Sequence, residues 1–191
     1  MSKRKSLFGV ILAVSSFTAS VENIGAAEFP QQIQAGEHRL ILNGWGARTK
    51  TLLQLYVAGI YLAHPSSNPV EIVSADEPAA IRIKITSGFV SQAKLVASLT
   101  EGFHKSTGGN IAPIQSQINR FRECFKETIT KGDIFDIVYV PKHGVIVNKN
   151  GRFKGVVTGV EFKKALFNIW LSDNPIDENL KRAMLSNRTT R

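Results

Sequence analysis

The sequence contains a single cysteine, Cys124, so no disulfide can form within the chain. It has neither a glycine-rich phosphate loop nor the GxSxG motif of many hydrolases. It also lacks clustered metal ligands, because no histidine has a second ligand at a spacing typical of metal sites. The isolated histidines are His38, His64, His104 and His143. We therefore expect no metal ion and no cofactor.

Basic residues outnumber acidic ones, 24 to 15, which gives a formal net charge of +9. Such a charge can indicate a nucleic-acid or membrane partner. The basic residues are scattered, however, and no basic run alternates with aromatic side chains. We expect no nucleic-acid partner. The charge is typical of a soluble protein with weak attraction to an anionic envelope.

The first 27 residues have the order of a secretory signal peptide. A basic start (residues 3–5) precedes an apolar stretch over 7–19, and small residues follow at 25–27. The apolar stretch is shorter than the ~20 residues that span a bilayer. We predict a signal peptide over 1–27, cleaved after Ala27, with Ser20 as a second candidate position and an uncleaved anchor as the alternative. The mature domain, 28–191, is then expected in the periplasm, without a transmembrane segment.

The spacing of hydrophobic residues predicts this order of elements along the chain: strands, then helices, then strands, then helices. Ile81, Ile83 and Ile85 alternate with polar residues, as in a half-buried strand, whereas Leu95, Leu99 and Phe103 recur at the helical spacing. The expected strands are 40–42, 51–62, 81–86, 133–140, 145–148 and 152–157; the expected helices are 91–106, 112–127, 161–171 and 178–185, with a short turn over 70–75. This order favours an α+β open-faced sandwich, a large antiparallel sheet covered by helices.

Two local signals refine this pattern. Residues 51–62 carry little charge and read as a central strand covered on both faces. Asn43-Gly44 indicates a turn or a bulge, and Gly46 permits a close approach of backbone.

Three stretches resemble the chalcone isomerase-like family, in its exported bacterial branch. They are LNGWGARTK at 42–50, LYVAGIYL at 55–62 and FKKALFNIWLSDNPI at 162–176. The resemblance implies the chalcone isomerase fold, with a cleft between sheet and helices. Plant members cyclise chalcones, and relatives bind fatty acids.

The resemblance also implies site residues. The family arginine matches Arg48, whose planar guanidinium suits a carboxylate or a polarised carbonyl. Tyr56 occupies the position of a threonine in the isomerases. Val90 matches the catalytic tyrosine, and a polar helix position falls near Ala97. The C-terminal Ser or Thr of the isomerases matches Asn168.

Valine cannot donate a proton, and no tyrosine occurs between Tyr61 and Tyr139. We therefore expect a non-catalytic binder of a small apolar carboxylate or phenolic ligand, held by Arg48 with help from Tyr56 or Asn168. One alternative is an intramolecular lyase of the chalcone isomerase type, with Arg48 as the electrophile and a water as the base. Another is a structural, partner-binding domain whose cleft is closed.

Overall fold

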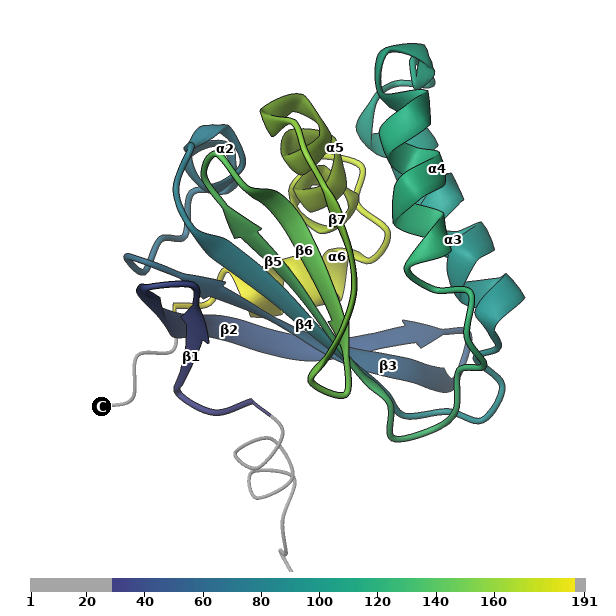
Figure 1. Ribbon diagram of the computed structural model, residues 1–191. Coiled ribbons are helices and arrows are strands. Elements are labelled where there is room, and N and C mark those ends of the chain that lie inside the picture. The colour runs from purple at the N-terminus through teal and green to yellow at the C-terminus, as the bar shows by residue number, and fades with distance from the viewer. Residues whose placement is uncertain (1–28, 188–191) are drawn as a thin grey trace, which may run out of the picture.

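The computed structural model describes residues 29–187, and the predicted signal peptide lies outside this range. Seven strands form one antiparallel sheet in which each strand pairs with its neighbours in the chain (Figure 1). They are β1 (Gln32–Ala35), β2 (His38–Lys50), β3 (Leu53–Leu62), β4 (Ala79–Ile85), β5 (Ile134–Val140), β6 (Gly144–Lys149) and β7 (Arg152–Val157).

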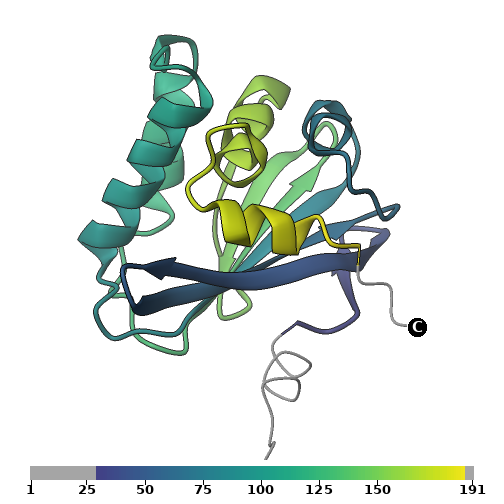
Figure 2. The same cartoon turned by 180° about the vertical axis from the view of Figure 1, so that it is seen from behind.

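Helices cover one face of this curled sheet, as Figures 1 and 2 show from opposite sides. They are α2 (Pro69–Ser74), α3 (Gln92–Ser106), the 3-10 turn η1 (Ala112–Ile114), α4 (Gln115–Glu123), α5 (Val160–Leu171) and α6 (Glu178–Met184). The main core lies between sheet and helices, and a smaller apolar cluster around Phe29 and Tyr61 covers part of the other face. The predicted α+β open-faced sandwich is confirmed.

β3 is the central strand that the sequence predicted. Its Tyr56, Ala58 and Ile60 belong to the main core, whereas Val57 and Tyr61 belong to the smaller cluster. Both faces of the strand are therefore buried, which explains why its sequence shows a nearly continuous apolar run.

β2 is much longer than the predicted 40–42. The Asn43-Gly44 pair is not a turn: the register shifts between Leu42 and Gly44 within one continuous strand, which is a β-bulge. β1 was not predicted, because this edge strand has only four residues and two of them are glutamines. The predicted helix over 112–127 is η1 followed by α4, which ends at Glu123.

Close packing of α6 on β2 explains the two glycines of this strand. A Cβ atom at Gly44 would lie 2.2 Å from the backbone oxygen of Ala183, and one at Gly46 would lie 2.6 Å from the Ala183 Cβ. The Asn43 amide also donates to the Met184 oxygen at 2.9 Å. The close approach predicted at Gly46 is therefore a contact with α6.

We predict that Gly44→Ala lowers the free energy of unfolding by at least about 2 kcal/mol, because a backbone carbonyl cannot move aside without shifting α6. Urea denaturation measures the change. Gly88→Ala is the control, since a Cβ there meets nothing within 4 Å; we expect it to stay within about 0.5 kcal/mol of the parent. Equal effects of the two substitutions would contradict the packing argument.

A buried lysine joins α5 to α2. Lys163 is completely buried, and its Nζ donates to the backbone oxygens of Ile72, Val73 and Ala75 at 2.9, 2.9 and 2.8 Å. These carbonyls lie at the end of α2, where a helix leaves its last acceptors without internal donors. The ammonium group therefore satisfies the C-terminus of α2 and orients α5.

We expect Lys163→Met to destabilise the fold by about 3 kcal/mol, because buried carbonyls lose their donor. The neighbouring Lys164→Met removes only a partly exposed ion pair with Glu161 and should cost no more than about 0.5 kcal/mol. Thermal and urea unfolding of the pair test this. A Lys163→Met variant as stable as Lys164→Met would show that water replaces the ammonium group.

Candidate functional site

A cleft of about 490 Å³ opens between the β2–β3 hairpin and α3. Residues from β2, β3, the loop over 86–91 and α3 line it, and most of the lining is apolar. The lining consists of Arg48, Lys50, Leu53, Leu55, Tyr56, Phe89, Val90, Lys94, Leu95, Ala97, Ser98 and Glu101. Arg48, Tyr56 and Val90, three of the four predicted site residues, thus share one cleft.

Arg48 lies deep in this cleft and is only 9% exposed. It stands directly opposite Tyr56 in the antiparallel register, so both side chains project from the same face of the sheet. Its Nη1 donates to the Ser98 hydroxyl at 2.6 Å, and its guanidinium carbon lies 5.8 Å from the centre of the Tyr56 ring. Among residues 29–187, no carboxylate lies within ion-pair distance of Arg48.

Tyr56 forms the floor of the cleft without closing it. The ring is buried, and the hydroxyl oxygen accepts a hydrogen bond from Trp170 Nε1 at 3.1 Å. Burial raises the pKa of the Tyr56 hydroxyl, although the nearby Arg48 charge partly opposes the shift. The phenol therefore stays protonated at neutral pH and retains a hydrogen that it can donate.

Ser98 is the polar residue of the site that the sequence did not predict. The family pattern indicated a polar helix position near Ala97, and Ala97 does line the cleft. The polar contact to Arg48 comes from the next residue of α3. An alignment shifted by one residue would have found it.

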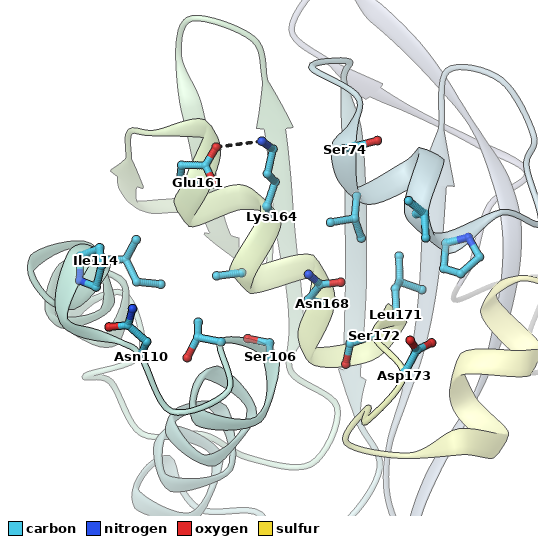
Figure 3. Close-up of a pocket in the computed structure, with 16 residues that line it drawn as sticks. Ser74, Ser106, Asn110, Ile114, Glu161, Lys164, Asn168, Leu171, Ser172 and Asp173 are labelled. Atoms are coloured by element: carbon cyan, nitrogen blue, oxygen red, sulfur yellow. Dashed lines mark hydrogen bonds and ion pairs between the residues drawn. The ribbon is translucent and has the colours of Figure 1, made fainter.

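Asn168 lies elsewhere. It lines a second pocket of about 630 Å³ between α2, α5 and the α3–α4 connection (Figure 3). Trp170 follows it by two residues, about 200° further around α5, and it is Trp170 that contacts Tyr56. The structure thus does not bring Asn168 together with Arg48. The only lysine of this second pocket, Lys164, is paired with Glu161 at 2.8 Å.

Within the described part of the chain, no cluster of acidic, histidine or cysteine residues could hold a metal ion. None of the helices in residues 29–187 has the length and hydropathy that a membrane span needs.

The sequence model of the chalcone isomerase-like family matches residues 21–186. The chain belongs to the chalcone isomerase-like family. No curated protein matches the sequence. Among solved structures, this chalcone isomerase-like chain is similar to the crystal structure of a fatty-acid binding protein from Arabidopsis thaliana. The TM-score is 0.66 and the sequences are 22% identical, with 83% of this chain and 91% of the Arabidopsis chain covered. The likeness shows a shared fold.

The hydroxyl of Tyr56 has a structural role that can be measured. Tyr56→Phe leaves the buried Trp170 N–H without an acceptor, so we expect the free energy of unfolding to fall by about 1–2 kcal/mol. Tyr61→Phe is the matched control, because the buried Tyr61 hydroxyl has no hydrogen-bond partner among the described residues. Its removal should be neutral or stabilising. Chemical denaturation followed by tryptophan fluorescence distinguishes the two, and equal losses would contradict the assignment.

Proposed function

We propose that this protein is an exported, non-catalytic binder of a small apolar carboxylic acid, such as a fatty acid. The carboxylate would pair with Arg48, and the tail would lie along the apolar walls of the cleft. The observation that carries the proposal is the buried guanidinium of Arg48, which has no carboxylate partner within residues 29–187.

A buried cation is costly unless an anion or several acceptors compensate it. Arg48 carries five N–H donors, and the Ser98 hydroxyl accepts from one nitrogen. A carboxylate can take two of the remaining donors side by side, which is the geometry that arginine matches best. The protonated Tyr56 hydroxyl next to it can supply a further hydrogen bond.

The size and lining of the cleft suit this ligand class. Small-molecule pockets measure roughly 300–1,000 Å³ and combine apolar walls with few polar anchors. Here Leu55, Val90 and Leu95 supply walls around the single arginine. The Arabidopsis relative of the same fold is a fatty-acid binding protein, which supports the same ligand class.

Two other functions have weaker support. The isomerases use a tyrosine at the position of Val90, which has no proton to give, and burial keeps Tyr56 protonated, so the phenol does not serve as a base. A purely structural domain would need a closed cleft, whereas the Arg48 cleft is open. We propose that binding takes place in the periplasm, because the sequence of the first 27 residues predicts a signal peptide.

Replacing Arg48 tests the proposal. We expect Arg48→Gln to weaken palmitate binding about 10- to 100-fold, because charge-assisted hydrogen bonds are lost. Titration calorimetry measures the affinity, and native mass spectrometry of protein purified from an envelope fraction identifies the ligand carried from the cell. Arg39→Gln, at an exposed position of the same strand, should bind as the parent does.

Palmitate binding that survives Arg48→Gln would contradict the proposal. So would a parent protein that binds none of laurate, palmitate and stearate. In that case, faster loss of chalcone absorbance with the protein than in buffer would support the isomerase alternative.

A further inference from the structure

The mouth of the Arg48 cleft carries large apolar side chains that point into solvent. Leu52 is 97% exposed and Phe89 is 67% exposed, and Leu53 is exposed beside them. Leu53 and Phe89 line the cleft, and Leu52 precedes Leu53 in the β2–β3 turn. Isolated exposed leucines are common, but three large apolar side chains around one opening indicate a binding surface.

Two separate loops carry these side chains and lie at the same end of the molecule (Figures 1 and 2). Leu52 occupies the β2–β3 turn, and Phe89 lies in the loop that enters α3. The Thr86 N–H donates to the Leu55 oxygen at 3.1 Å, which ties the second loop to the start of β3. The apolar side chains therefore stand on two adjacent tips rather than on a flat face.

Lysines flank the tips. Lys50 and Lys94 line the cleft and are exposed, and the Lys94 Nζ donates to the Phe89 oxygen at 3.1 Å. The acid of the cleft lining, Glu101, is paired with Lys105 at 3.4 Å. The mouth thus combines projecting apolar tips with positive charge, the combination that binds at the surface of an anionic bilayer.

We propose that the cleft mouth, formed by Lys50, Leu52, Leu53, Phe89 and Lys94, docks onto an anionic lipid bilayer. The apolar tips enter the headgroup region, and the lysines contact lipid phosphates. A second copy of the chain fits this surface poorly, because its own mouth carries the same positive charge. Docking would open the cleft directly toward lipid, so that an apolar ligand could enter without crossing water.

A local probe tests the orientation of docking. The buried Cys124 is the only cysteine, so Leu52→Cys allows one surface position to be labelled with an environment-sensitive dye. We expect a blue shift with phosphatidylglycerol-containing vesicles and a much smaller one with phosphatidylcholine alone. The same dye at Val70→Cys, a 73% exposed position on α2, should not respond. No response at position 52, or equal responses at both positions, would overturn the proposal.

Vesicle co-sedimentation measures the energetic role of the tips. The double substitution Leu52→Ser, Phe89→Ser should lower partitioning onto anionic vesicles at least about tenfold, because two inserted apolar side chains are lost. The matched double Val70→Ser, Phe153→Ser, at comparably exposed positions, should leave it unchanged. Equal partitioning of both doubles would overturn the proposal.

Docking and ligand binding can fail separately. Arg48→Gln should weaken palmitate binding yet still dock, since Arg48 lies buried in the cleft. Leu52→Ser should weaken docking yet bind palmitate in solution as the parent does, since Leu52 does not line the cleft. A loss of docking in Arg48→Gln equal to that in Leu52→Ser would contradict the assignment of the surface.

Discussion

The packing of α6 on β2 determines where the cleft can open. The helix lies along the strand, with its N-cap Asp177 accepting from the Thr49 N–H and its last turn bonded to Asn43. Gly44 and Gly46 allow the backbone of α6 to approach β2 closely, and they lie in the part of β2 that precedes Arg48. Arg48 follows directly on the same face of the strand, and its side chain reaches Ser98 of α3. The close contact in one half of β2 thus leaves room for a site in the other half.

The chemistry of that site follows from burial. Arg48 brings a guanidinium group, which suits paired oxygen acceptors, into a largely apolar cleft. The protein compensates it with the Ser98 hydroxyl and with the hydroxyl and ring of Tyr56, which stabilise a guanidinium less than a carboxylate does. Burial in the same environment raises the pKa of the Tyr56 hydroxyl, so the neutral phenol is favoured. A guanidinium beside a protonated phenol attracts an anion, which supports the proposed binding of a carboxylate.

The fold could be predicted from the sequence because the spacing of apolar residues follows the burial of each strand and helix. β3 reads as apolar on both faces, and α3 shows the helical spacing, so element type and order could be inferred. The edge strand β1 is too short, at four residues, to show a clear apolar pattern. The Asn43-Gly44 pair is compatible with a turn and also with a bulge inside a long strand, so the sequence alone could not decide between them. For the site, the family motifs predicted that Arg48 and Tyr56 belong to one site. The antiparallel register of β2 and β3 brings these two residues opposite each other. Helix phase was harder: Ser98 lies one residue from the expected position, and Asn168 lies on the side of α5 away from Tyr56.

The two ends of the cleft differ in polarity, and this difference favours one direction for the proposed acid ligand. The buried end offers charge at Arg48, whereas the exposed end offers Leu53 and Phe89. A bound acid with its head at the buried arginine would direct its tail toward the apolar side chains at the opening. Its tail then ends at the solvent-exposed tips, where the walls no longer limit its length. Such a cleft would select strongly for the acidic head and weakly for chain length, and the uncovered end of a long tail would itself favour contact with lipid.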